Sequence, residues 1–362
     1  MESYTISDLM RPNILSLTPY SSARNEFDGE ASIFLDANEN YRDFIGSSAR
    51  NRYPDPMHKA LKKKISETFG FSESSVVVGN GSDELIDLLF RIFCVPRKDK
   101  ALMLNPTYGA YKVFADINDI GISYSSLDAD FSIDEKRMHT QCELIRKGSV
   151  ETGMHKLFFI CSPNNPTGNS FSIDQIESMA RCFPGITVVD EAYIDYSDGE
   201  SAVSLIKKND RVVVLRTLSK AWGLANVRIG IAIADEKIIE IMHHVKYPYN
   251  LSGIQQELAI EALSKKDEVD SVIAFIKEER KRVAERLEHY SFVQKVFPSD
   301  ANFILVRFDD PLAVYSALLE KGIIVRKRNT VAGCYGCLRL TIGSAQENDI
   351  LLQTLDSFEE RV

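Results

Sequence analysis

Short runs of β-branched and other apolar residues recur between residues 75 and 233, with helical patterns between them. The runs cover Ser75–Val78, Ala101–Leu104, Lys156–Ile160, Ile186–Val189, Val212–Leu215 and Ile229–Ile233. Apolar runs without polar alternation are typical of strands that are buried on both faces. Helices are predicted over Pro56–Phe69 and Ser82–Phe93. Because buried strands alternate with helices, the sequence predicts an α/β fold with a mostly parallel central sheet and helices on both faces.

The pattern changes near Leu251–Gly253. A long amphipathic helix is predicted from Asp267 to His289, and short strands and helices follow it. The strands cover Asn302–Val306, Ile323–Arg326 and Cys337–Thr341, and the helices cover Pro311–Glu320 and the chain from Gln346. We therefore expect an irregular N-terminal arm over residues 1–44, a large domain over 45–265 and a smaller C-terminal α+β domain over 266–362. The arm is expected to pack with the small domain.

Charge and composition exclude several classes of protein. The chain of 362 residues has a formal net charge of −9, whereas nucleic-acid-binding proteins bind phosphates through basic surfaces. No apolar run reaches the length of a membrane span, and the first residues do not resemble a secretory signal. The cysteines are scattered and are expected to be reduced thiols of a cytoplasmic protein. Cys334 and Cys337 have the spacing of a metal or redox pair, but no second pair or nearby histidine completes a site, so no metal is expected.

Lys220 follows the β-branched run Arg211–Arg216 and stands beside two hydroxyl residues, Thr217 and Ser219. A lysine becomes nucleophilic when desolvation or neighbouring cations lower its pKa. The hydroxyls, together with Arg228 farther along the chain, suit a phosphate. This combination is typical of a lysine that holds a phosphorylated aldehyde, as in enzymes that use pyridoxal phosphate. The alternative is a surface lysine at a strand-to-helix turn.

Other predicted strands also end in polar groups, and the carboxyl ends of parallel strands meet at one edge of a sheet. The turn at Ser82 and Asp83 opens a helix, whose free backbone N–H groups favour a phosphate. Asp190 could keep a proton on a pyridine nitrogen. Asn165 and Tyr193 could bind the phenolic oxygen of the ring, and Tyr108, in the segment Asn105-Pro-Thr-Tyr108, could stack on its face. Simpler explanations are a cap or turn for Asp190, a turn for the segment around Asn165, and core packing for the tyrosines.

These motifs resemble those of the fold-type I pyridoxal phosphate enzymes, the aspartate aminotransferase superfamily. The matching segments are Ser162-Pro-Asn-Asn-Pro-Thr-Gly168, Asp190-Glu-Ala-Tyr193 and Thr217-Leu-Ser-Lys220 with Arg228 downstream. Further segments resemble the histidinol-phosphate aminotransferase family within class II: Leu17-Thr-Pro-Tyr-Ser-Ser-Ala-Arg24, Leu35-Asp-Ala-Asn-Glu-Asn40, Arg52-Tyr-Pro-Asp55, Gly81-Ser-Asp-Glu84, Ser299-Asp-Ala-Asn-Phe303 and Cys337-Leu-Arg-Leu-Thr-Ile-Gly343. The resemblance covers nearly the whole chain.

The resemblance implies a role for each matching residue. Lys220 is similar to the lysine that forms the Schiff base and moves protons, and Asp190 to the residue that contacts the ring nitrogen. The cofactor pyridoxal 5'-phosphate would be bound by Ser82, Asp83, Tyr108, Asn165, Asp190, Tyr193, Thr217, Ser219, Lys220, Arg228 and Tyr53. Tyr53 looks like the tyrosine that reaches the cofactor phosphate of the partner subunit, which implies a homodimer. Tyr20, Arg326 and Arg339 resemble substrate-binding residues.

The implied reaction is a reversible transamination between histidinol phosphate and 2-oxoglutarate, which yields imidazole-acetol phosphate and glutamate in histidine biosynthesis. One amine donor carries a phosphate and the other is a dicarboxylate, so a shared site needs anion receptors, and guanidinium groups bind both kinds of anion. Arg339 lies in an otherwise apolar run, which argues against a surface role. Arg326 has Lys327 and Arg328 beside it and could instead belong to a solvated basic cluster.

The sequence departs from the family pattern at Tyr41, where proline is frequent, and at Asn226, where glycine is common. Neither change removes a catalytic group. Three other readings stay open: a threonine-phosphate decarboxylase of the same fold, an aromatic or broad-specificity aminotransferase, and a catalytically silent regulatory module. The last is disfavoured because every catalytic position is filled.

Overall fold

The computed structural model describes residues 4–20, 32–46, 50–147 and 153–361. Its larger part is a seven-stranded sheet in the order β1-β7-β6-β5-β4-β2-β3. These strands are β1 (Val76–Asn80), β2 (Lys100–Asn105), β3 (Gly121–Ser126), β4 (His155–Cys161), β5 (Ile186–Asp190), β6 (Val212–Thr217) and β7 (Ile229–Ile233). Strand β7 runs antiparallel to both of its neighbours, and the other pairs are parallel. The predicted mostly parallel sheet is therefore confirmed.

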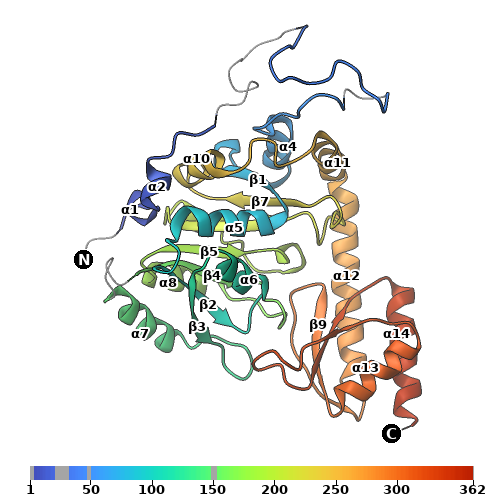
Figure 1. The fold of residues 1–362 in the computed structure, drawn as a ribbon. Coiled ribbons are helices and arrows are strands. Elements are labelled where there is room, and N and C mark those ends of the chain that lie inside the picture. Colours follow the sequence, from blue (N-terminus) through green and yellow to red (C-terminus); the bar gives the residue numbers. More distant parts are fainter. Residues whose placement is uncertain (1–3, 21–31, 47–49, 148–152, 362) are drawn as a thin grey trace.

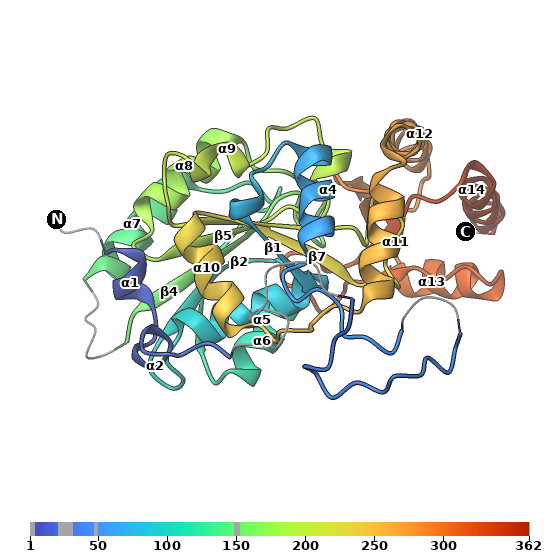
Figure 2. The ribbon, with the colours of Figure 1, turned by 90° about the horizontal axis from the view of Figure 1, so that it is seen from above.

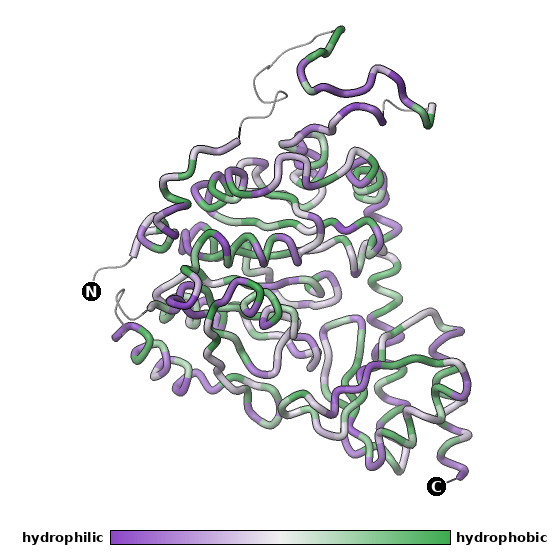
Figure 3. Tube along the Cα trace, viewed as in Figure 1, coloured by the Kyte–Doolittle hydropathy of each residue, from purple (hydrophilic) through white to green (hydrophobic). Residues whose placement is uncertain are grey.

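Helices cover both faces of this sheet (Figures 1 and 2). Alternate residues of each strand point to opposite faces. Strand residues such as Val78, Phe158 and Val189 pack in one core, and Val77, Phe159 and Val188 pack in the other. The first core is covered by α4 (Lys59–Phe69), α7 (Glu135–Arg146), α8 (Ile173–Cys182), α9 (Val203–Ile206) and α11 (Gly253–Leu263), and the second by α5 (Gly81–Phe93), α6 (Ala110–Ile117) and α10 (Glu236–Val245). Burial on both faces explains the continuous apolar runs (Figure 3).

The smaller part has its own antiparallel sheet, in the order β10-β11-β9-β8. Its strands are β8 (Val293–Val296), β9 (Phe303–Phe308), β10 (Arg326–Lys327) and β11 (Cys337–Thr341), and its helices are α12 (Lys266–Leu287), α13 (Pro311–Glu320) and α14 (Ala345–Glu359). A separate core joins these elements, with Val283, Val306, Leu340 and Leu355 among its buried residues. The predicted strand over Ile323–Arg326 is wrong in its bounds, because only Arg326 and Lys327 pair with β11. The domain boundaries at residues 44/45 and 265/266 stay predictions.

The described part of the N-terminal arm differs from the expectation. It contains two one-turn helices, α1 (Ile6–Leu9) and α2 (Pro12–Leu15). Ile6, Leu9 and Met10 are buried in the core of the large sheet, and Arg11 donates to the backbone carbonyl of Arg91 at 3.0 Å. This segment therefore packs on the large domain and not on the small one, because its apolar residues complete the core beside α5. The segment that resembles a family motif at 17–24 extends past residue 20 and so lies partly outside the described residues.

The described residues also form two short 3₁₀ helices, η1 (Glu73–Ser75) and η2 (Ile194–Tyr196). All of the cysteines are buried and free. Among the described helices, none is both long enough and apolar enough to cross a lipid bilayer.

Candidate active site

A cavity of about 600 Å³ lies where the carboxyl ends of β4, β5 and β6 meet the small domain. Both parts of the chain line it. The predicted site residues on its wall are Ser82, Asp83, Tyr108, Asn165, Asp190, Tyr193, Thr217, Ser219, Lys220, Arg228, Arg326 and Arg339. The structure thus brings together residues from segments that are far apart in sequence. Their roles stay predictions, but their common position is what a shared ligand requires.

Lys220 lies in the connection between β6 and β7, and its Nζ is 5.5 Å from the ring centroid of Tyr193. Its ammonium has no hydrogen bond or ion pair with any described residue. The pKa of Lys220 is lowered, first by desolvation and then by the guanidinium of Arg339. A lower pKa increases the fraction of neutral amine near pH 7, which is the form that attacks a carbonyl.

Asp190 ends β5 and is 3% exposed. Its Oδ2 accepts a hydrogen bond of 2.6 Å from the hydroxyl of Tyr111, and its Oδ1 accepts one of 3.1 Å from the backbone N–H of Ala192. Burial raises the pKa of Asp190, and the Tyr111 hydrogen bond opposes that rise. Because each carboxylate oxygen accepts a hydrogen bond, the carboxylate is held in one orientation, as a group that accepts a proton at a defined position must be.

Tyr111 contacts the predicted site residue Asp190, and the sequence interpretation did not single it out. It is fully buried in α6, and its ring stacks on Phe159 at a centroid distance of 4.8 Å. The available signal was its position, because Tyr111 lies only three residues after Tyr108, and its backbone N–H donates to the carbonyl of Tyr108 at 3.3 Å. The two rings meet edge to face at 5.4 Å.

The turn between β1 and α5 forms a cradle of backbone N–H groups. Gly81 has a φ of +75°, and Gly230 of β7 lies directly beside it. A Cβ on Gly230 would lie 2.3 Å from the backbone nitrogen of Ser82, so only glycine lets the two segments approach this closely. The N–H groups in the first turn of α5 have no partner within the helix, and such groups bind anions.

Side chains complete this cradle. The Arg228 guanidinium lies 3.2 Å from the Asp83 carboxylate. The backbone N–H of Ser219 donates to the hydroxyl of Thr217 at 3.1 Å, and that hydroxyl also lies 3.0 Å from the carbonyl oxygen of Ile229. The hydroxyls of Thr217 and Ser219 and the guanidinium of Arg228 line the same cavity as the start of α5, which is a suitable arrangement for a phosphate group.

Asn165 connects the large domain to the small one. Its side-chain oxygen accepts a hydrogen bond of 2.5 Å from Nη1 of Arg339, on β11. Tyr193 packs edge to face against Phe303 at 5.2 Å, and burial raises its pKa. Burial and the Asp83 carboxylate raise the pKa of Tyr108 to about 12. Both phenols are therefore neutral near pH 7 and can donate hydrogen bonds to a ligand.

Two predicted residues do not line this cavity. Tyr20 is 73% exposed and borders a different cavity, together with Lys62 and His243. Tyr53 stacks on Tyr249 at a centroid distance of 4.4 Å, and about half of its surface is exposed. A single chain thus leaves both tyrosines outside the site, and their proposed roles stay predictions.

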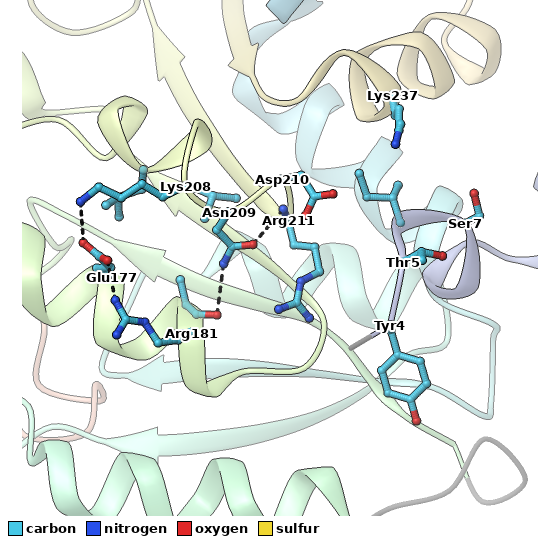
Figure 4. Close-up of a pocket in the computed structure, with 14 residues that line it drawn as sticks. Tyr4, Thr5, Ser7, Glu177, Arg181, Lys208, Asn209, Asp210, Arg211 and Lys237 are labelled. Atoms are coloured by element: carbon cyan, nitrogen blue, oxygen red, sulfur yellow. Dashed lines mark hydrogen bonds and ion pairs between the residues drawn. The ribbon is translucent and has the colours of Figure 1, made fainter. Parts of the chain in front are cut away.

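A second cavity, of about 560 Å³, lies at the opposite edge of the sheet, where β6 begins (Figure 4). Glu177 pairs there with Arg181 at 2.6 Å and with Lys208 at 3.0 Å. Glu177, Arg181 and Lys208 therefore satisfy one another, and none of the residues predicted to be functional borders this cavity. Across the described ranges, we find no cluster of three or more metal-ligating side chains.

Comparison with known proteins agrees with this geometry. The sequence model of aminotransferase class I and II matches residues 21–355. A histidinol-phosphate aminotransferase from Christiangramia forsetii is 42% identical over 99% of both chains.

Two solved structures show the same fold. A histidinol-phosphate aminotransferase from Clostridium acetobutylicum has a TM-score of 0.77 at 24% identity, covering 86% of this chain and 91% of that one. Another, from Sinorhizobium meliloti in complex with pyridoxal-5'-phosphate, also has a TM-score of 0.77, at 22% identity, covering 86% and 83%. The chain belongs to the class I and II aminotransferase family.

Proposed function

We propose that the protein is a histidinol-phosphate aminotransferase that uses pyridoxal 5'-phosphate. It would transfer an amino group between histidinol phosphate and 2-oxoglutarate, giving imidazole-acetol phosphate and glutamate. The observation that carries this proposal is the position of the unpaired Lys220 amine in a cavity that also contains Asp190 and three arginines of the small domain. The relatives that share about two fifths of their residues with the chain carry the same name.

The residues present fit the cofactor. The first turn of α5, with Thr217, Ser219 and Arg228 beside it, suits the phosphate. Gly230 allows β7 to lie against this turn, since a Cβ at residue 230 would meet the backbone of Gly81 and Ser82. Asp190 is buried and would face a ring nitrogen, while Asn165 and Tyr193 would bind the phenolic oxygen. When bound, pyridoxal phosphate supplies an aldehyde that exchanges amines and a protonated ring that withdraws electrons.

The chain's own groups then perform the proton chemistry. The neutral Lys220 amine would take a proton from the α-carbon of the substrate, which its lowered pKa favours. Asp190, whose carboxylate is held by Tyr111 and Ala192, would keep the ring nitrogen protonated. Tyr108 would lie against the ring face, and its hydroxyl lies 3.5 Å from Asp83. Arg326 and Arg339 would orient the anionic end of either substrate. Tyr20 borders a different cavity in the single chain, so its proposed contact with the substrate requires the second subunit.

A homodimer is part of the proposal, with Tyr53 of each subunit reaching the cofactor phosphate of the other. The described arm supports it, because Ile33, Leu35, Phe44 and Ile45 expose most of their apolar surface in the single chain. Residues 32–46 extend away from both sheets (Figure 1). A second subunit would cover this surface and bring Tyr53 near a site. We also propose that the enzyme acts in the cytoplasm, in keeping with its free thiols.

The test is transamination by the purified protein. Histidinol phosphate with 2-oxoglutarate is compared with phenylalanine and with threonine phosphate, and both glutamate and carbon dioxide are measured. The proposal is supported if glutamate forms faster with histidinol phosphate than with either of the other amine donors. Release of carbon dioxide from threonine phosphate without glutamate would identify a decarboxylase, and faster turnover of phenylalanine would identify an aromatic aminotransferase. No turnover of any substrate would favour the silent regulatory module.

A further inference from the structure

Arg328 lines the candidate site beside Arg326 and Arg339, although the sequence interpretation assigned it no role. Its Nε is buried and has no hydrogen-bond partner, and the same holds for Nε of Arg339. Within the described ranges, none of the three guanidinium groups forms an ion pair with a carboxylate. Burial, and then the charges of Arg339 and Arg326, lower the pKa of Arg328 to about 10. A half-buried cation held near two others, without a counter-ion among the described residues, favours the binding of an anion.

The backbone explains why Arg328 faces the cavity. Arg326 pairs with Arg339 across β10 and β11, and the backbone N–H of Arg328 continues this ladder to the carbonyl of Cys337 at 3.0 Å. Side chains alternate along an extended segment, so Arg326 and Arg328 share one face. Lys327 lies on the other face, where its Nζ is 4.5 Å from the ring centroid of Tyr315.

The charges on the cavity wall indicate what kind of anion fits. Lys220, Arg228, Arg326, Arg328 and Arg339 are cationic, whereas Asp83 and Asp190 are the carboxylates. Arg228 is paired with Asp83, so the excess positive charge lies at the small-domain end, with the arginines. A phosphate monoester presents three terminal oxygens that share nearly two negative charges, whereas a carboxylate presents two oxygens that share one charge. Three convergent guanidinium groups therefore match a phosphate better than a single carboxylate.

We propose that Arg328 is a specificity-determining residue that binds the substrate phosphate together with Arg326 and Arg339. The inference rests on the proposed function and deepens it, because it assigns the preference for a phosphorylated amine over a dicarboxylate to this residue.

The experiment compares Arg328→Gln and Arg328→Lys with Lys327→Gln, which removes the same charge from the opposite face of the segment. For each dimeric, cofactor-loaded enzyme, kcat/KM is measured with histidinol phosphate and, in the reverse direction, with glutamate. Losing one charge-assisted contact should lower kcat/KM for histidinol phosphate by about 30-fold in Arg328→Gln, mainly through KM, and that for glutamate by about 3-fold. Arg328→Lys should lie between, and Lys327→Gln should match the wild type.

A second measurement does not depend on turnover. Calorimetric titration with glycerol 3-phosphate, a phosphate monoester without an amine, should show about tenfold weaker binding to Arg328→Gln than to the wild type and Lys327→Gln. If both substrates lose activity equally, or if glycerol 3-phosphate binds unchanged, the inference is overturned. If the wild type does not transaminate histidinol phosphate, the proposed function fails instead, and the calorimetry still decides whether Arg328 binds a phosphate. Arg328→Lys keeps a cation and serves as the folded variant if Arg328→Gln is unstable.

Discussion

Arg326 and Arg339 are direct cross-strand partners in the antiparallel pair β10–β11. Like charges in this position destabilise a strand pair. Arg339 is partly relieved by its hydrogen bond to Asn165, whereas no side-chain partner of Arg326 is found among the described residues. An anion bound between the two guanidinium groups would attract both of them and offset their mutual repulsion. This gives a physical reason for the position of the pair at the cavity.

Lys220→Ala should abolish turnover, because it removes both the attacking amine and the proton carrier. We expect kcat to fall by at least about 10³-fold and the absorbance band of the lysine–cofactor linkage to disappear. Lys237→Ala is a suitable control, since Lys237 borders the cavity at the opposite edge of the sheet. Near-normal transamination by Lys220→Ala would contradict the assignment.

Tyr111→Phe should shift the pH dependence of the reaction. The Tyr111 hydroxyl donates to Asp190 and lowers the pKa of that carboxyl, so removing the hydroxyl raises the pKa further. The acidic limb of the kcat profile should therefore move to higher pH, by about one unit. Tyr124→Phe, on exposed β3, should leave the profile unchanged. If the pH profile of Tyr111→Phe coincides with that of the wild type, the Tyr111 hydroxyl does not affect the reaction through Asp190.

Gly230→Ala should destabilise the fold and the phosphate cradle together. The added Cβ would meet backbone atoms of Gly81 and Ser82 at 2.3 Å, and backbone cannot yield as a flexible side chain can. We expect a loss of about 3 kcal/mol in the free energy of unfolding, measured by urea denaturation. Gly109→Ala, where no atom lies within 4 Å of the new Cβ, should change this free energy by much less. Equal stability of the two variants would show that the close approach is absent.

His58→Phe should reduce the sensitivity of the protein to acid. His58 is fully buried, neither ring nitrogen has a hydrogen-bond partner, and Lys246, Lys62 and His243 surround it with potential positive charge. Burial, followed by Lys246, lowers its pKa to about 3. Between pH 6.5 and 3 the unfolded chain binds a proton at this residue that the folded chain does not, so stability falls as the pH falls through this window.

For this single group, the loss from pH 7 to pH 5 is about 2 kcal/mol. Phenylalanine has a similar ring without a titrating nitrogen, so His58→Phe should lose correspondingly less stability over the same range. The free energy of unfolding at both pH values measures this. His289→Phe, at an exposed position, is the matched control. An identical pH dependence of His58→Phe and the wild type would refute the prediction.

Mixed dimers test whether Tyr53 acts across the interface. Tyr53→Phe removes one hydrogen bond to a charged phosphate, so its homodimer should bind the cofactor about tenfold more weakly. A hybrid of one Tyr53→Phe and one Lys220→Ala subunit should contain one site with both Lys220 and Tyr53 intact. That site should bind the cofactor with wild-type affinity and restore turnover. Hybrids without this recovery would show that Tyr53 acts within its own subunit.

The sequence predicted the central sheet well because its strands are buried on both faces and carry unbroken apolar runs. Strand β3 was missed, since its residues Gly121–Ser126 mix polar and apolar side chains at the edge of the sheet. The arm was expected to pack with the small domain, whereas Ile6, Leu9 and Met10 pack in the core of the large sheet. Their apolar pattern is too short to indicate which domain they contact. Tyr111 and Arg328 were missed for a different reason: their proposed roles depend on the residues that they face, and a linear sequence does not show this.

Strand β7 has a consequence beyond its place in the sheet. Because it runs antiparallel to β6, the chain leaves the sheet at Thr217 and returns at Ile229 along the same edge. One excursion, residues 218–228, therefore delivers both Lys220 and Arg228, the proposed nucleophile and a proposed phosphate anchor. Inserting or deleting residues between them would disturb two functions at once. Length variation should therefore be tolerated less in this segment than in any surface loop at the opposite edge.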